Sequence, residues 1–197
     1  MNKRKILITA FALLTLFLIG GTMAYFTDTE TVTNTFTLGN VDITLTEPNF
    51  VAANATGLMP GSVVAKNPII TNVGASSAYV FLKVTEPCYN TAKVFNYTLN
   101  SGWTVVGTAG SCSGSGVSTI DTVYAYSNGT AMTELPTSGT TATAALFDNV
   151  TINGNLDATA VNALSATTIQ MVINAYAIQK DNLSSTAPGT VWTNFSS

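Results

Sequence analysis

Two cysteines and ten carboxylates are the residues of this 197-residue chain whose chemistry can be anticipated from the sequence. Carboxylates grouped at suitable spacing can bind metal ions or transfer protons. The ten acidic residues show neither an HExxH-like motif nor paired spacing, and the sequence contains no His. His-based triads and the common catalytic zinc sites are thereby excluded. We expect no enzymatic activity, no cofactor and no bound metal.

The first 24 residues have the pattern of an export signal. Three basic residues at positions 3–5 precede a predominantly apolar run at residues 6–19, and small side chains then lead to Ala24. This order predicts a signal peptide over residues 1–24 that is cleaved between Ala24 and Tyr25. The alternative is an uncleaved membrane anchor, but a bilayer needs about 20 predominantly apolar residues and a Gly-Gly pair interrupts this run.

Export determines how the two cysteines are interpreted. Secreted proteins fold in an oxidising compartment, which favours a disulfide between Cys88 and Cys112. The bond would close a loop of about 25 residues and contribute roughly 3.5 kcal/mol by chain entropy. The alternative is a pair of buried, unpaired thiols.

The charge of the mature chain excludes several kinds of partner. Only 9% of all residues are charged, against about 25% in a typical soluble domain. After cleavage, four lysines face ten acidic residues, a net charge of −6. A charge-poor, weakly acidic surface attracts neither nucleic acid nor anionic lipid. We therefore expect no nucleic-acid partner and, after cleavage, no membrane contact.

Alternation of apolar and polar residues dominates the mature chain and predicts β-strands. Residues 78–86 are apolar on nearly both faces, which predicts a central strand. The other expected strands cover residues 41–46, 62–64, 68–73, 94–99, 103–106, 117–126, 144–152 and 168–179. A turn is expected at residues 127–130, and a helix at 157–164 with Asn155 or Asp157 as its N-cap. The fold predicted for residues 25–197 is one all-β domain, a jelly-roll-like antiparallel β-sandwich with at most one or two short helices.

The segment at residues 25–38 differs from the other expected strands. Threonine occupies every odd position from 27 to 37, so one face of an extended chain would be a ladder of threonines. The other face carries four apolar residues, which are Phe26, Val32, Phe36 and Leu38. Such a strand buries little by itself and needs a host sheet. The alternative is an ordinary first strand in its own sandwich.

Several short motifs carry a resemblance to a known family. The tract at residues 20–28 reads Gly-Gly-Thr-Met-Ala-Tyr-Phe-Thr-Asp, and residues 34–43 read Asn-Thr-Phe-Thr-Leu-Gly-Asn-Val-Asp-Ile. Shorter matches lie at residues 58–61, 72–74, 79–83, 146–150 and 175–179. The chain resembles the TasA/camelysin family of secreted matrix-fibre subunits, whose signal peptides end in a similar tract.

The resemblance implies a structural subunit of an extracellular or biofilm-matrix fibre. In such a fibre a dedicated signal peptidase releases the N-terminus, which then inserts into the next subunit by donor-strand exchange. Phe26, Val32, Phe36 and Leu38 are the expected anchors, and cleavage at Ala24-Tyr25 would act as the switch. The implied partners are further copies of the chain, joined head to tail, and the signal peptidase. An accessory matrix protein is a further candidate. The implied location is the extracellular matrix or cell surface.

A second class of function fits the same fold. A monomeric secreted adhesin or accessory binding module would share the sandwich without polymerising. Trp103 and Trp192 could line a carbohydrate surface in such a protein, although isolated tryptophans more often pack in a core. Some camelysin relatives carry a metalloprotease label, which the absence of His in this sequence does not support.

Overall fold

The structure is a computed structural model that describes residues 40–137, 141–167, 169–181 and 183–196. Contacts within the chain divide it into two units, Met1–Leu38 and Gly39–Ser197. The predicted signal peptide and the predicted strand at residues 25–38 lie outside the described residues. The helices and strands that follow all belong to the second unit.

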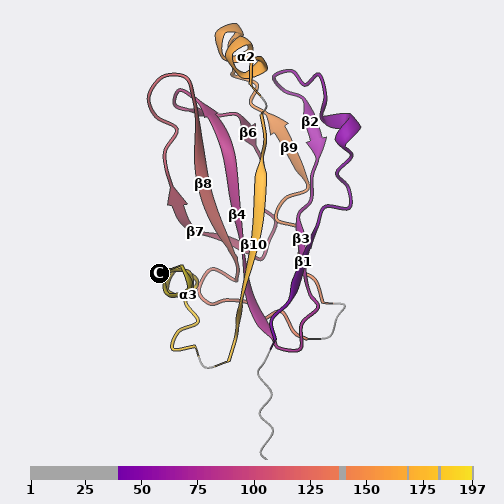
Figure 1. The fold of residues 1–197 in the computed structure, drawn as a ribbon, viewed down its shortest axis with the longest axis vertical. Helices are drawn as coiled ribbons and strands as arrows, with labels where there is room; N and C mark the ends of the chain where they lie inside the picture. The colour runs from indigo at the N-terminus through magenta and orange to yellow at the C-terminus, as the bar shows by residue number, and fades with distance from the viewer. Residues whose placement is uncertain (1–39, 138–140, 168, 182, 197) are drawn as a thin grey trace, which may run out of the picture. The chain divides into compact units, whose positions relative to one another are not determined.

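The largest sheet is antiparallel and has the strand order β10-β4-β8-β7 (Figure 1). Its strands are β4 (Ala78–Tyr89), β7 (Trp103–Ala109), β8 (Val117–Tyr126) and β10 (Val172–Gln179). A two-residue strand, β5 (Ala92–Lys93), pairs with the end of β4. β4 lies between β10 and β8, so the predicted central strand is confirmed.

Two smaller antiparallel sheets complete the sandwich. One pairs β1 (Ile43–Thr46) with β3 (Ile69–Asn72). The other has the order β2-β9-β6, formed by β2 (Val63–Ala65), β6 (Phe95–Asn96) and β9 (Asn149–Ile152). Figure 1 shows both beside the β10 side of the large sheet. The predicted all-β antiparallel sandwich is confirmed.

The main core lies between the large sheet and the smaller ones. One face of β4 contributes Val80, Leu82 and Val84, each with no exposed surface. The smaller sheets and the intervening loops contribute Ile70, Leu135, Leu146, Phe147 and Val150. Burying large aliphatic and aromatic side chains contributes about 1.5–3 kcal/mol each, which makes this cluster the principal source of stability.

A second apolar cluster lies on the opposite face of the large sheet. Tyr79 and Phe81 of β4 pack there with Val123 of β8 and with Val191 of α3 (Pro188–Phe195). The ring of Trp192, also in α3, lies 5.2 Å from the ring of Phe81, centroid to centroid. Because α3 covers this face, β4 is buried on both sides, which explains its continuous apolar sequence.

Helix α3 was not predicted, whereas α2 (Ala158–Ser165) matches the predicted helix. Asp157 is the N-cap of α2, since its Oδ1 accepts a hydrogen bond from the backbone N of Ala160 at 2.8 Å. A short 3-10 helix, η2 (Ala52–Ala55), interrupts the loop before β2. The predicted turn is confirmed, with Asn128 Oδ1 accepting from Ala131 N at 2.8 Å and Gly129 at positive φ.

Several predicted strands are shorter in the structure, two of them by more than half. The strand expected at residues 94–99 is reduced to β6, and the strand expected at 144–152 is reduced to β9. Backbone hydrogen bonds to loops replace ladder pairing at their missing ends. Asn100 N donates to Leu146 O, and Leu146 N donates to Pro68 O, both at 2.9 Å. Tertiary contacts therefore override local β-propensity at these positions.

Candidate functional site

The sequence-predicted functional residues fall into two groups. Ala24 and Tyr25 at the predicted cleavage point lie outside the described residues. The same is true of the predicted anchors Phe26, Val32, Phe36 and Leu38. The candidate site is therefore built from exposed strand edges and the apolar surface beside them.

β10 forms one edge of the large sheet and, among the described residues, pairs only with β4. β1 likewise pairs only with β3 within the described part of the chain. The two edges border the same side of the main core. Their inward side chains are only partly covered, and they are Val41, Ile43, Leu45, Met171, Ile173, Ala175 and Ala177. An unpaired edge beside a partly covered core is a surface to which another strand can be added.

An apolar pocket of about 660 Å³ lies beside the first residues of β10. Val64 of β2 and Val150 and Ile152 of β9 line one wall. Val161 and Leu164 of α2 line another. Met171 and Val172 connect the pocket to the edge of β10. Its volume lies within the range of about 300–1,000 Å³ that is typical of ligand pockets.

Exposed apolar side chains gather around this pocket. Phe50, Ile169 and Val172 line it, and each is exposed by more than a third. Single exposed apolar residues are ordinary, but a group of them around one pocket marks an interaction surface. We call these three residues the apolar rim.

The loop that carries Phe50 is held at the pocket by polar contacts. The Lys66 ammonium lies 2.7 Å from the Glu47 carboxylate and 4.9 Å from the centre of the Phe50 ring. The backbone N of Asn49 donates to Asn67 Oδ1 at 2.8 Å, and Asn67 is buried. These contacts fix the loop through an ion pair, a cation–π contact and a hydrogen bond. Among the described residues that line the pocket, Lys66 is the one basic residue, and it is already paired.

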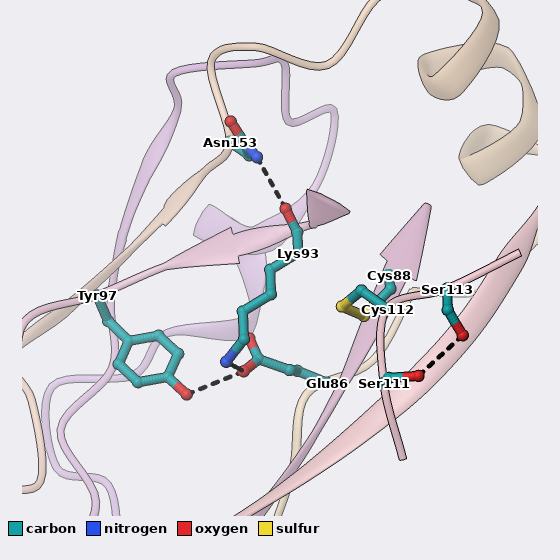
Figure 2. Close-up of a disulfide and its surroundings, with 8 residues drawn as sticks. All are labelled: Glu86, Cys88, Lys93, Tyr97, Ser111, Cys112, Ser113 and Asn153. Atoms are coloured by element: carbon teal, nitrogen blue, oxygen red, sulfur yellow. Dashed lines mark hydrogen bonds and ion pairs between the residues drawn. A yellow bond between two sulfur atoms is a disulfide. The ribbon is translucent and has the colours of Figure 1, made fainter. Parts of the chain in front are cut away.

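Cys88 and Cys112 form a disulfide, with their Cα atoms 5.4 Å apart. Cys88 is fully buried in β4, whereas Cys112 belongs to the glycine-rich loop between β7 and β8. Figure 2 shows the bond close to Glu86 and Lys93. The bond attaches this exposed loop to the central strand of the sheet.

A polar network near the disulfide was not predicted from the sequence. Glu86 in β4 has no exposed surface, and its Oε1 accepts from Lys93 Nζ at 2.5 Å and from Tyr97 OH at 3.1 Å (Figure 2). Tyr97 OH is also 2.8 Å from Tyr124 OH. Among the described residues, Glu86 Oε2 has no hydrogen-bond partner. The signal in the sequence was a Glu that alternates with Val80, Leu82 and Val84 on one face of β4.

Burial governs the acidity of the two tyrosines in this network. Desolvation raises the pKa of Tyr97, and its hydrogen bond to Tyr124 and the negative charge of Glu86 raise it further. Desolvation likewise raises the pKa of Tyr124, although its hydrogen bond with Tyr97 and the charge of Lys93 oppose the shift. Both hydroxyls therefore stay protonated well above neutral pH.

The two tryptophans do not line an exposed surface. Trp103 is 5% exposed and donates from Nε1 to Ala144 O at 3.0 Å. Trp192 packs against Phe81, Tyr176 and Phe195 beneath α3. The structure therefore places both tryptophans in packing roles, with Trp192 partly buried.

The fold and the site define an antiparallel β-sandwich protein with an apolar pocket beside the edge strand β10. Residues 2–93, a little under half of the chain, match the family model described as camelysin metallo-endopeptidase. This match supports membership of the chain in the TasA/camelysin family. No curated protein and no solved structure matches it.

The family's description implies a metal, which the donor set of this chain does not fit. The sequence has no His, and its two cysteines are joined in a disulfide. No three Cys, Asp or Glu side chains converge within the described ranges. Four carboxylates, those of Glu47, Glu86, Asp121 and Glu134, are already paired with lysines. Catalytic zinc sites use three protein ligands drawn from His, Glu, Asp and Cys, and no such set is assembled here.

Family membership carries a general statement about location. Camelysin-type proteins are extracellular or associated with the cell surface. In the part of the chain that the structure describes, no helix is long and apolar enough to cross a membrane.

Proposed function

We propose that this protein is a structural subunit of an extracellular or biofilm-matrix fibre that polymerises by donor-strand exchange. The observation that carries the proposal is the unpaired edge of β10, which borders a partly covered core and an apolar pocket. The donor is the segment at residues 25–38 of another copy, whose alternation suits an added strand.

The donor and acceptor are physically complementary. An added strand gains backbone hydrogen bonds along β10, which is eight residues long. Its apolar face, with Phe26, Val32, Phe36 and Leu38, would cover the side chains that β1 and β10 leave partly exposed. Its threonine face would point to solvent and support the extended conformation. Both the pairing and the burial favour assembly.

Export would control when the donor becomes available. In the proposal, residues 1–24 direct secretion and hold the N-terminus at the membrane until a signal peptidase cuts between Ala24 and Tyr25. Release then frees the donor segment outside the cell, where further copies of the chain are its partners. An accessory matrix protein could start or terminate the fibre. The proposed role is structural rather than enzymatic, since the sequence has no His for a triad or a common catalytic zinc site.

The pocket favours one alternative, a monomeric secreted binding module. A volume of about 660 Å³ would suit a small apolar ligand. The rim of exposed apolar residues extends beyond such a ligand, which favours an occupant of the size of a peptide segment. The two functions differ in whether residues 25–38 are needed.

Truncation tests the proposal. A mature chain that begins at Tyr25 is compared with one that begins at Val41, by electron microscopy and sedimentation after concentration under oxidising conditions. We expect uniform filaments from the first chain and only folded monomers from the second, with circular dichroism as the control for folding. Filaments from the chain that begins at Val41 would refute donor-strand exchange. Folded monomers from both chains would instead favour the binding module.

A further inference from the structure

The apolar pocket and the start of the described chain lie at opposite ends of β10. Met171 and Val172, at the beginning of the strand, line the pocket. At its other end, Gln179 pairs with Ala78, and Lys180 N donates to Ser77 O at 3.0 Å. Figure 1 shows α2 at the upper end of the sandwich and β1 near the lower end.

The described part of the chain begins at this second end of β10, where hydrogen bonds and close packing hold residues 40–42. Ser76, next to Ser77, donates from its backbone N to Asn40 O at 3.0 Å. Gly74 lies so close to this segment that a Cβ atom would come within 2.5 Å of Asp42 N. Gly74 is itself fixed, because its N donates to the Oδ1 of the buried Asn72 at 3.0 Å. The N-terminal segment therefore leaves the sandwich at a fixed point.

The positions of the donor's exit and of the pocket at opposite ends of β10 favour an open polymer over a closed dimer. If each copy received a donor at the same end from which its own donor left, two copies could exchange donors reciprocally and close a dimer. Here the donor leaves near the end of β10 and the pocket opens near its beginning, about 26 Å away for eight residues of strand. A head-to-tail contact between opposite ends is heterologous, and it propagates into a filament when the rotation between successive copies does not close a ring.

We infer that the pocket receives Phe36 and Leu38 of the next copy, an inference that rests on the proposed function. The body of that copy lies beyond the pocket, and residues 36–38 are the part of its donor closest to its own body. They therefore reach the pocket first, and the rest of the donor continues along β10 toward Gln179. The donor is then antiparallel to β10.

The length of the donor agrees with this arrangement. Fourteen extended residues, 25–38, span about 46 Å, whereas β10 spans about 26 Å. About 20 Å of donor therefore extends beyond the strand edge. In this arrangement the pocket and the apolar rim take the excess, and Phe36 and Leu38 point to the same side because they are two residues apart.

Charge distinguishes this orientation from the reverse one. Residues 32–38 carry no charge, whereas Asp28 and Glu30 lie in the first half of the donor. The reverse orientation would bring both carboxylates to an apolar pocket whose one cation, Lys66, is already paired with Glu47. Charged groups without a partner are costly in an apolar pocket. The antiparallel orientation leaves them outside it.

Cross-linking in assembled filaments tests the position and the direction of the donor. Thr37→Cys or Thr27→Cys is combined with Ile169→Cys on the rim, in a mature chain that begins at Tyr25. Both threonines lie on the same face of the donor, so the two cysteine pairs are matched. Neither substitution removes one of the four apolar anchors of the donor. A short thiol cross-linker should give a ladder of covalent oligomers with Thr37→Cys and none with Thr27→Cys. A ladder with Thr27→Cys alone would overturn the orientation.

Filling the pocket is an independent test. Val172→Trp places a large side chain at the pocket, and Val105→Trp is the matched control on β7, at the other edge of the same sheet. Both valines are exposed, 44% and 54%, so both variants should fold. We expect Val172→Trp to slow filament growth at least about tenfold, as loss of an interface anchor does, and Val105→Trp to leave it unchanged.

The outcomes separate this inference from the proposed function. Normal growth of Val172→Trp filaments, with no ladder from either cysteine pair, would refute the pocket as the acceptor while donor-strand exchange still stood. Folded wild-type chains that never form filaments would refute the proposed function itself, and this inference with it.

Discussion

Glu86 and Lys93 form an ion pair in which the carboxylate is completely buried and the ammonium is partly exposed. A buried charge is tolerated only when it is paired and hydrogen-bonded. Lys93 and Tyr97 satisfy Oε1, whereas Oε2 has no hydrogen-bond partner among the described residues. The stability of the central strand therefore depends on a single cation.

Replacing Lys93 should be costly. We expect Lys93→Met to lower the free energy of unfolding by about 2 kcal/mol, since a buried carboxylate loses its partner. Combining it with Glu86→Gln should restore most of the loss because the buried charge is then removed. Urea denaturation measures both. Lys180→Met, in the exposed pair with Glu134, is the control and should leave the unfolding midpoint unchanged.

The buried tyrosines predict a dependence on alkaline pH. Because burial raises the pKa of Tyr97 and Tyr124, their contribution to stability is complete below the unfolded pKa of about 10 and decreases above it. The urea midpoint should fall as the pH rises from about 9 to 11, and Tyr97→Phe with Tyr124→Phe should flatten that decrease. Equal slopes in the two proteins would contradict the assignment.

At the scale of the elements, the disulfide attaches the glycine-rich loop between β7 and β8 to the end of β4. The two cysteines are 24 positions apart in sequence. Replacing both by serine should lower the free energy of unfolding by roughly 3.5 kcal/mol, mainly because the unfolded chain gains freedom. Thermal denaturation with and without reductant measures the effect. A reductant that shifts the midpoint of the serine variant as strongly as that of the natural protein would contradict this origin.

The long strands could be predicted because their sequences alternate over many residues. β4 and β8 lie where the pattern indicated, and the apolar faces of β4 identified it as central. Helix α3 was missed, although Pro188 at its first turn and the spacing of Val191, Trp192 and Phe195 were helix signals. These helix signals were overlooked because the surrounding sequence favours strands.

The pocket and the polar network could not be predicted from local patterns. Their residues come from segments far apart in the chain, as Val64, Val150 and Leu164 do in the pocket. Hydrophobic periodicity and secondary-structure propensity describe residues that are neighbours in sequence. The contacts in the pocket and in the polar network depend instead on which strands pair. The donor at residues 25–38 stays a prediction from the sequence, based on a segment with too few apolar residues to support itself.

At the scale of the whole molecule, the described sandwich has a direction. The N-terminal segment leaves beside Ser76, near the end of β10, and the apolar pocket opens near its beginning. This difference between the two ends of the sandwich suits a polar fibre. In such a fibre every copy donates a strand at one end and receives one at the other. Family membership is consistent with such a matrix role.

The most direct test of this account is a cryo-electron microscopy reconstruction of filaments grown from the mature chain that begins at Tyr25. The account predicts continuous density for a strand beside the edge of β10 that can be traced to residues 25–38 of a neighbouring copy. A reconstruction in which this strand belongs to the same copy, or in which the edge of β10 remains unpaired, would contradict it.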